Sequence, residues 1–184
     1  MTPRAVRGLL IGRFQPFHGG HLEVVRTIRS SRPAEELLLV VGSAQESYTW
    51  KNPFTAGERL EMIARALEEA KVTGCTAVPV PDIQRHALWV GYLQSQLPPF
   101  ERVYTNNPLT QLLFEKARLA VENPPVFDRH KYEGEHVREQ LAAGKDWRTL
   151  VPPSVERYLE EIGAPARLAL LKQGEGRSSK KRGA

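Results

Sequence analysis

The stretch "LLIGRFQPFHGGH", Leu9–His21, decides the fold because an apolar strand runs there into the start of a helix. Its first part belongs to "GLLIG", Gly8–Gly12, an apolar run of strand length with a glycine at each end. The segment that follows, "HLEVVRTI" (His21–Ile28), places its apolar residues on one helical face. The sequence therefore predicts a strand, a short loop and a helix, in that order.

The same alternation of strand and helix continues along the chain. "ELLLVVGS", Glu36–Ser43, is a continuous apolar run, as expected of a strand covered on both faces of a parallel sheet. Thr55 and Glu58 have the spacing of a capping box, which predicts a helix over "TAGERLEMIARALEEAK". Further elements are predicted as a strand over Thr76–Ile83, a helix over Trp89–Gln96, a strand over Arg102–Asn107 and a helix that begins at Pro108. This order predicts an α/β fold with a doubly wound, Rossmann-like parallel sheet.

The final third of the chain is predicted to be mostly helical. "HVREQLAAG", "PPSVERYLEEIG" and "PARLALLKQ" are each ended or preceded by Gly or Pro, which commonly bound helices. The last eleven residues, "GEGRSSKKRGA", hold four basic side chains against one acidic one, a net of +3 out of the chain's +5. Such a composition is typical of a disordered, solvated end. We expect a Rossmann-like core over 1–135, a helical C-terminal subdomain over 136–173 and a disordered basic tail over 174–184.

Composition restricts the class of protein. A chain of 184 residues with 41% hydrophobic residues is long enough for one sizeable core. The single cysteine, Cys75, excludes an intrachain disulfide and suits a reducing compartment. The longest apolar run, Leu37–Val41, is too short to span a bilayer, and the N-terminus lacks the apolar segment of a signal peptide. We therefore expect a cytoplasmic protein without a membrane partner, and the nearly neutral body makes nucleic acid an unexpected partner.

The loop after the first strand is the predicted site. In doubly wound sheets ligands bind beyond the carboxyl ends of the strands, where this loop meets a helix N-terminus. Gly19 and Gly20 let a phosphate approach the unpaired N–H groups of that helix. His18 and His21, one turn apart, would face the same anion, and Arg13 adds a permanent cation. The pattern therefore predicts an anion site for a phosphorylated ligand.

Other interpretations of this loop fit its residues less well. The stretch matches neither G-x-G-x-x-G nor G-x-x-x-x-G-K-[ST], so it carries neither the dinucleotide fingerprint nor the P-loop. A zinc site would favour histidines four residues apart and a third ligand. Helix capping alone would explain the two histidines but not the Arg, Gln and Gly-Gly around them.

The loop after the first predicted strand also resembles the signature of a known family. "GRFQPFHGGH" is similar to the HxGH signature of the nucleotidyltransferase superfamily, which also includes class I aminoacyl-tRNA synthetases. Later blocks, together with this one, resemble the archaeal-type nicotinamide mononucleotide (NMN) adenylyltransferases over roughly residues 7–173. These blocks are "GSAQESYTWKNPFTAGER", "PDIQRHALWVGYL", "PPFERVYTNNPLTQLLF" and "VPPSVERYLEEIG". The resemblance implies transfer of the adenylyl group of ATP to NMN, giving NAD and pyrophosphate, with Mg²⁺ assisting. It also implies a homo-oligomer, since multimers are common in this family.

The resemblance also implies roles for individual residues. The reacting phosphates would be contacted by four catalytic residues, His18, His21, Arg13 and Arg138. ATP and its phosphates would be bound by Gly12, Phe14, Gln15, Gly20, Lys51 and Asn107. NMN would be bound by Asp82, Ile83, His86 and Trp89, with the tryptophan stacked on the cationic nicotinamide ring. No residue of the chain is expected to bind a metal directly.

The chain departs from the family pattern at several motif positions. The second phosphate motif usually reads S-x-T-x-x-R, whereas "YEGEHVR" places Glu133 and Glu135 at the hydroxyl positions and retains Arg138. His86 stands where asparagine is common, and Tyr48 where histidine is usual. We expect the two glutamates to turn outward at the N-terminus of the following helix. Recruitment of Mg²⁺ and loss of adenylyl transfer are the competing explanations.

Alternatives from other functional classes remain open at the level of sequence. A related adenylyltransferase or cytidylyltransferase would use another phosphorylated acceptor. A catalytically weakened nucleotide-binding module would bind ATP and release no pyrophosphate. An RNA-binding protein that uses the basic tail would show salt-dependent binding.

Overall fold

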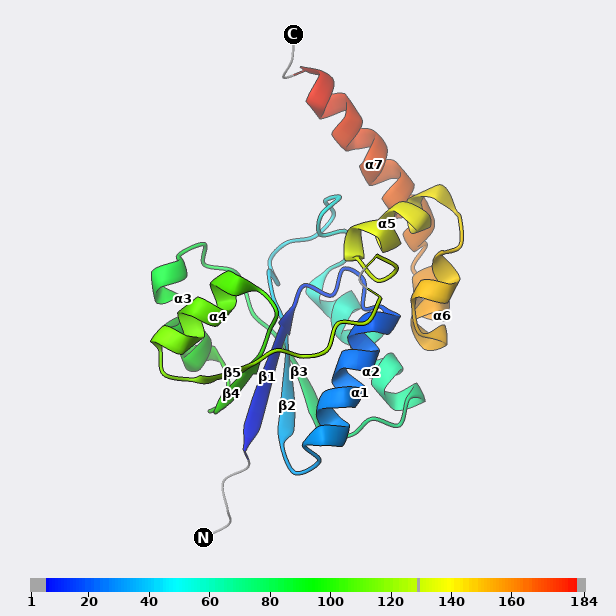
Figure 1. Cartoon of the computed structure of the whole chain (residues 1–184). Coiled ribbons are helices and arrows are strands. Elements are labelled where there is room, and N and C mark those ends of the chain that lie inside the picture. Colours follow the sequence, from blue (N-terminus) through cyan, green and yellow to red (C-terminus); the bar gives the residue numbers. More distant parts are fainter. Residues whose placement is uncertain (1–5, 129, 182–184) are drawn as a thin grey trace.

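The computed structural model describes residues 6–128 and 130–181, and its centre is a parallel β-sheet between two layers of helices (Figure 1). The strands are β1 (Arg7–Gly12), β2 (Glu36–Val41), β3 (Cys75–Pro79), β4 (Arg102–Tyr104) and β5 (Ala120–Glu122). They pair in the order β3-β2-β1-β4-β5, and every pairing is parallel. The predicted doubly wound sheet is therefore confirmed.

Helices alternate with the strands and continue after them. They are α1 (Gly19–Ser31), α2 (Ala56–Glu69), α3 (His86–Gln96), α4 (Pro108–Lys116), α5 (Gly134–Ala143), the 3₁₀ turn η1 (Trp147–Leu150), α6 (Pro153–Glu161) and α7 (Ala164–Lys181). The capping box predicted for α2 is present, because Thr55 Oγ1 accepts from Glu58 N and Glu58 Oε2 accepts from Thr55 N. No helix among the described residues is long and apolar enough to cross a membrane.

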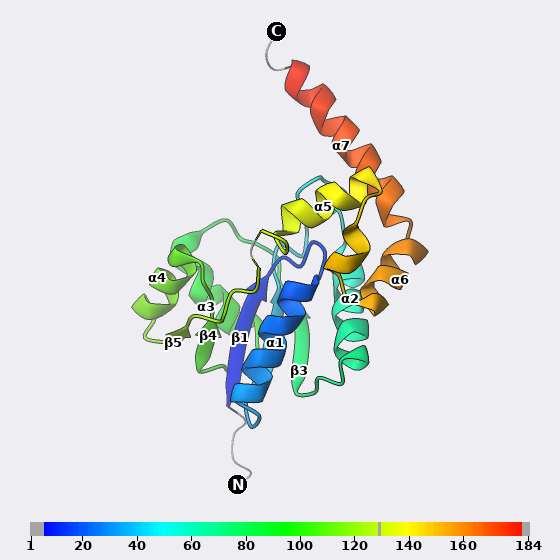
Figure 2. The same ribbon diagram turned by 45° about the vertical axis from the view of Figure 1, so that its right-hand side comes forward.

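Both faces of strand β2 are buried, which explains why its sequence is apolar. Leu37 and Leu39 point into one buried cluster, whereas Leu38 and Val40 point into another, because side chains alternate across a strand. The first cluster lies under α1 and α2, and the second lies under α3 and α4. Figure 2 shows these two helical layers on opposite sides of the sheet.

The C-terminal helices extend the first of these clusters. Val137 and Leu141 of α5 and Leu159 of α6 are fully buried in the same cluster as the core side chains of α1 and α2. The predicted helical region is thus packed on the layer formed by α1 and α2, as both views show (Figures 1 and 2). The division into a core over 1–135 and a subdomain over 136–173 stays a proposal.

The structure differs from the expected disordered tail. Helix α7 continues through Lys181, so residues 174–181 of the predicted tail are helical, and residues 182–184 lie outside the described part. Helix α7 has already started on buried residues such as Leu168, and the good helix formers Glu175, Arg177, Lys180 and Lys181 let it continue through the poorer Gly and Ser residues between them. Composition alone shows that this segment is polar. A polar composition does not distinguish a coil from the continuation of a helix that has already started.

Several strands end earlier than predicted, and one strand was missed. β2, β3 and β4 stop at Val41, Pro79 and Tyr104, because the chain turns there into the loops of the site. The missed strand is β5, Ala120–Glu122, whose three residues are too few to show a period-two pattern.

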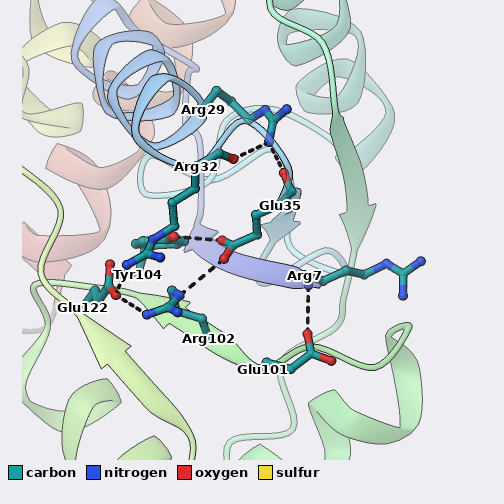
Figure 3. A network of polar contacts seen from close by, with 8 residues as sticks. All are labelled: Arg7, Arg29, Arg32, Glu35, Glu101, Arg102, Tyr104 and Glu122. Atoms are coloured by element: carbon teal, nitrogen blue, oxygen red, sulfur yellow. Dashed lines mark hydrogen bonds and ion pairs between the residues drawn. The ribbon is translucent and has the colours of Figure 1, made fainter. Parts of the chain in front are cut away.

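A polar network centred on Glu35, directly before β2, joins several elements on the α1 side of the sheet (Figure 3). Tyr104 Oη donates to Glu35 Oε1 at 2.8 Å, and Arg102 Nε donates to Glu35 Oε2 at 3.3 Å. Arg102 and Arg32 both pair with Glu122 at the other side of the network. We call these five residues the Glu35 network.

Candidate active site

The carboxyl ends of the central strands border a cavity of about 330 Å³. This volume lies at the lower end of the range for small-molecule sites, and the place is where doubly wound sheets bind ligands. Six residues predicted for the site line this cavity: Gly12, Arg13, Asp82, His86, Trp89 and Asn107. It therefore joins the loop after β1 to the residues predicted to face the nicotinamide.

The two histidines form a reciprocal pair at the N-terminus of α1. His18 Nδ1 accepts from His21 N and His21 Nδ1 accepts from His18 N, each at 3.3 Å. Their rings are stacked, with centroids 3.5 Å apart and an angle of 19° between the planes. Because both Nδ1 atoms accept backbone N–H groups, each neutral ring carries its proton on Nε2. Each histidine therefore presents an Nε2–H donor, as a phosphate oxygen requires.

Burial keeps these imidazoles neutral. It lowers the pKa of His18 to about 3, and burial together with His18 holds the pKa of His21 well below its ordinary value. At neutral pH the pair thus acts as two hydrogen-bond donors without positive charge. The positive charge of the site comes instead from arginines.

Tyr132 covers the two glycines at this helix start. A Cβ atom added at Gly19 would lie 2.9 Å from Tyr132 Cε1, and one added at Gly20 would lie 2.8 Å from Tyr132 Cβ. The ring also stacks on His18, with centroids 5.9 Å apart. In this structure the lack of side chains at Gly19 and Gly20 therefore leaves room for the aromatic ring of Tyr132. Sequence reasoning gave Tyr132 no role, although it directly precedes the second phosphate motif.

Arg138 reaches the same region from α5. It is buried, and its Nη1 donates to Gln15 O at 3.0 Å. Its Nε is buried without a hydrogen-bond partner in the described part of the chain. Burial, followed by repulsion from Arg13, lowers the pKa of Arg138. An unpaired donor on a buried cation is a position that an anion would satisfy.

Gln15 and Phe14 support the loop. Both polar atoms of the Gln15 side chain bond to the backbone of Phe54, each at 2.9 Å, so this side chain ties the loop after β1 to the loop after β2. The Phe14 ring is buried against Gly12 and lies edge-on to His21, with centroids 4.9 Å apart. Direct contact of either residue with ATP stays a prediction.

The other eight predicted site residues do not line the cavity as the described residues define it. Six of them lie on the loop after β1, at the start of α1 or on α5, namely Phe14, Gln15, His18, Gly20, His21 and Arg138, and the other two are Lys51 and Ile83. Lys51 is exposed on the loop after β2, and Ile83 is half-buried after β3. Arg85, which sequence reasoning did not select, lines the cavity beside His86. It is the residue before α3, where the path of the loop, rather than any motif, determines its direction.

The residues predicted for NMN lie on two elements. Trp89 of α3 is half-buried, packs edge-on against Phe114 at 5.6 Å and borders the cavity with another part of its surface. Asp82 is exposed, and its Oδ1 accepts from Gln84 N at 2.9 Å. Gln45 fixes this loop because its Oε1 accepts from Asp82 N at 2.9 Å.

The two unexpected glutamates lie at the N-terminus of α5. Glu133 is the residue before the helix and Glu135 is in its first turn, and both are exposed. Acidic side chains are favourable there because of the helix dipole. This exposure is compatible with the outward placement expected from sequence, which stays a prediction.

Metal ligands do not converge in the part of the chain that the structure describes. No three His, Cys, Asp or Glu side chains come together there in a way that could hold a metal ion. Among the residues that line the cavity Asp82 supplies the one carboxylate, and the groups assigned to phosphate are imidazole N–H groups and arginines, which do not suit Mg²⁺.

Fold and site together define a nucleotidyltransferase, and the cytidylyltransferase-like family model matches residues 9–140. Within this class the chain belongs to the nicotinamide-nucleotide adenylyltransferases of archaeal type. The protein of that name from Methanolobus tindarius is 46% identical over 162 residues, which cover 88% of this chain and 92% of the relative. The one from Picrophilus torridus is 40% identical over 170 residues, covering 92% and 99%.

Solved structures agree on the fold. Two crystal structures of a bifunctional NMN adenylyltransferase/ADP ribose pyrophosphatase from Francisella tularensis superpose with TM-scores of 0.73 and 0.76, at 16% and 17% identity. They match 97% of this chain, which spans 55% and 56% of their length. The first of them contains AMP and a manganese ion.

Proposed function

We propose that the protein transfers the adenylyl group of ATP to NMN, forming NAD and pyrophosphate. The observation that carries this proposal is the cavity that joins Arg13, on the loop that leads to the histidine pair, to Asp82 and Trp89. One substrate would place its phosphates at the α1 N-terminus while the other places its base near α3. Membership of the adenylyltransferase family supports the same reaction.

The residues suit this chemistry without a protein nucleophile. A phosphate oxygen of NMN attacks the α-phosphorus of ATP, the bond to the bridging oxygen of the β-phosphate breaks, and pyrophosphate leaves. Negative charge grows on the phosphate oxygens, so catalysis needs positioning and fixed donors. We assign the Nε2–H groups of His18 and His21 and the guanidinium groups of Arg13 and Arg138 to these oxygens.

On the acceptor side, Trp89 and Asp82 would select the nicotinamide. The tryptophan offers a ring face to a cationic ring, and the aspartate adds an opposite charge. We propose that Mg²⁺ accompanies ATP, because this ion is usually held through substrate phosphates with few protein ligands. What it supplies when bound is neutralisation of phosphate charge.

The experiment mixes the protein with NMN, ATP and Mg²⁺ and measures NAD and pyrophosphate. A matched set of other phosphate monoesters replaces NMN in parallel reactions. We expect NAD and pyrophosphate in equal amounts with NMN. Preference for another monoester would identify a related transferase, and ATP binding without pyrophosphate would identify a nucleotide-binding module.

We also propose a homo-oligomer and a cytoplasmic location, both on the resemblance and composition. The exposed side chains of Leu88 on α3 and Leu112 on α4 agree with a contact between subunits. Light scattering coupled to size exclusion measures the subunit number. A monomeric mass at micromolar concentration would contradict the proposed homo-oligomer.

A further inference from the structure

Arg59, in the first turns of α2, is fully buried, and within the described residues its side chain bonds only to backbone carbonyls. Its Nη1 donates to Gly42 O at 2.7 Å and to Arg13 O at 3.0 Å. Its Nη2 donates to Ser43 O at 3.2 Å, and its Nε donates to Thr55 O at 3.2 Å. Buried arginines usually pair with carboxylates, because burying an unpaired charge is costly.

Three of the four carbonyls that Arg59 holds belong to the border of the cavity. Arg13, Gly42 and Ser43 all line it, and they follow the neighbouring strands β1 and β2. One guanidinium group therefore fixes two loops relative to each other just beyond the strands. Its planar, forked donors suit this geometry, whereas an ammonium group could not reach the three carbonyls equally well.

The charge near Arg59 is also unusual. Burial, followed by repulsion from Arg13, lowers the pKa of Arg59 to about 10, so it remains protonated at neutral pH. The Arg13 side chain is exposed and has no hydrogen bond or ion pair within the described residues. The position of the Arg13 side chain therefore depends on its backbone, and Arg13 repels the buried cation of Arg59.

We propose that Arg59 is a positioning residue for adenylyl transfer, which acts on the reacting phosphates through Arg13. It holds the Arg13 carbonyl, and with it the direction of that side chain. The buried positive charge of Arg59 repels the Arg13 guanidinium when no anion is bound. The same charge adds to the attraction for an anion that binds beside Arg13. The kinetic test of this proposal rests on the proposed function. A second test measures the affinity for ATP.

A double-mutant cycle tests this coupling. Wild type, Arg59→Met, Arg13→Ala and the double variant are compared by kcat, by KM for each substrate and by the ATP dissociation constant. We expect Arg59→Met to lower kcat about tenfold to a hundredfold, because small misplacements of a catalytic group cost that much. In the Arg13→Ala background the same change should lower kcat by less than about twofold.

Arg65→Met on the same helix is the matched control. Arg65 pairs at the surface with Glu61 and Glu161, outside the cavity. Its replacement should change kcat and ATP affinity by less than about twofold in both backgrounds. Equal effects of Arg59→Met with and without Arg13 would overturn the proposal.

Arg59→Lys guards against simple loss of folding. It keeps the charge and part of the bonding, so we expect a folded protein with a kcat between wild type and Arg59→Met and the same dependence on Arg13. If both Arg59 variants are unfolded by circular dichroism, the residue holds the fold as a whole and the proposal is wrong. If wild type makes no NAD, the proposed function fails, and the ATP-affinity cycle still tests the coupling.

Discussion

Gly20 illustrates at the scale of one residue how the site constrains the chain. A methyl group there would lie 2.8 Å from Tyr132 Cβ and 3.0 Å from Cγ, so Gly20→Ala must displace the ring. We expect a loss of about 1–3 kcal/mol in the free energy of unfolding, as for overpacked sites.

Gly91→Ala on α3 is the control, since nothing lies within 4 Å of its added Cβ. That control should gain about 0.5–1 kcal/mol. Urea unfolding measures both, and equal losses would contradict the clash.

His18 permits a second test because capping and catalysis use different atoms. His18→Asn retains an N-cap acceptor for α1 and removes the Nε2–H donor. We expect kcat to fall by about 10²–10³, as for removal of one donor to a developing oxyanion, with a small change in ATP affinity. Steady-state kinetics and calorimetry of ATP binding measure the two effects. Loss of ATP binding with an unchanged residual kcat would show instead that the donor stabilises bound ATP and not the transition state.

The depressed pKa of His18 also predicts how stability depends on pH. Between its folded value of about 3 and its ordinary value of 6.5, the unfolded chain binds a proton that the folded protein does not. Stability is therefore full above pH 6.5 and falls as the pH decreases, by up to about 1.4 kcal/mol per pH unit for this histidine. Urea unfolding from pH 7.5 to 5 should show this fall in wild type and a shallower one in His18→Asn. Parallel curves would contradict it.

Among single residues, the neighbours within a contiguous motif could be predicted from sequence, whereas contacts between distant loops could not, even where the residues themselves were predicted for the site. His18 and His21 lie three positions apart, so their neighbourhood follows from helix geometry. Gln15 and Phe54, or Arg138 and Gln15, are 39 and 123 residues apart. Their contacts depend on the path of the loops, which no local pattern encodes.

At the scale of elements, prediction succeeded where a segment carried its own signal. Helix α2 has a capping box and a regular apolar face, and it begins one residue after the predicted cap. β5 has only three residues, and α7 continues into a polar segment where tertiary packing no longer decides the conformation. Loop geometry set the ends of β2, β3 and β4, because side chains such as Gln45 and Arg59 hold the backbone there.

The N-terminus of α5 gives a prediction about an element. Glu133 occupies the N-cap position without a side-chain cap bond, so Ser there should cap better, while the loss of Glu135 weakens the dipole interaction. The double replacement of Glu133 by Ser and Glu135 by Thr should therefore change stability by less than about 1 kcal/mol. We expect adenylyl transfer to be unchanged or faster, as measured by NAD formation at several Mg²⁺ concentrations.

The same double variant decides between the explanations for the glutamates. Loss of Mg²⁺-dependent turnover in a folded protein would show that the carboxylates bind the metal. Single replacements at each position then identify the ligand.

At the scale of the whole molecule, the groups that stabilise the sheet and those assigned to the site lie apart. Tyr104 and Glu35 are buried in the Glu35 network, whereas neither lines the cavity described here (Figure 3). Burial and the neighbouring Glu35 carboxylate raise the pKa of Tyr104, so its hydroxyl remains a donor at all pH values that the protein would meet. The network links β4, β5 and the C-terminal end of α1 without using a group of the proposed reaction.

This separation predicts that Glu35→Ala lowers stability and leaves catalysis unchanged. The variant removes the acceptor of Tyr104 and one acceptor of Arg102, so we expect a loss of about 1–3 kcal/mol in the free energy of unfolding. Glu23→Ala is the control, because its ion pair with Arg26 is about half exposed and should contribute less than about 1 kcal/mol. Assayed well below the unfolding temperature, kcat and both KM values should match wild type. A changed KM in Glu35→Ala would mean that the sheet transmits the state of this network to the cavity, and that stability and catalysis are coupled through it.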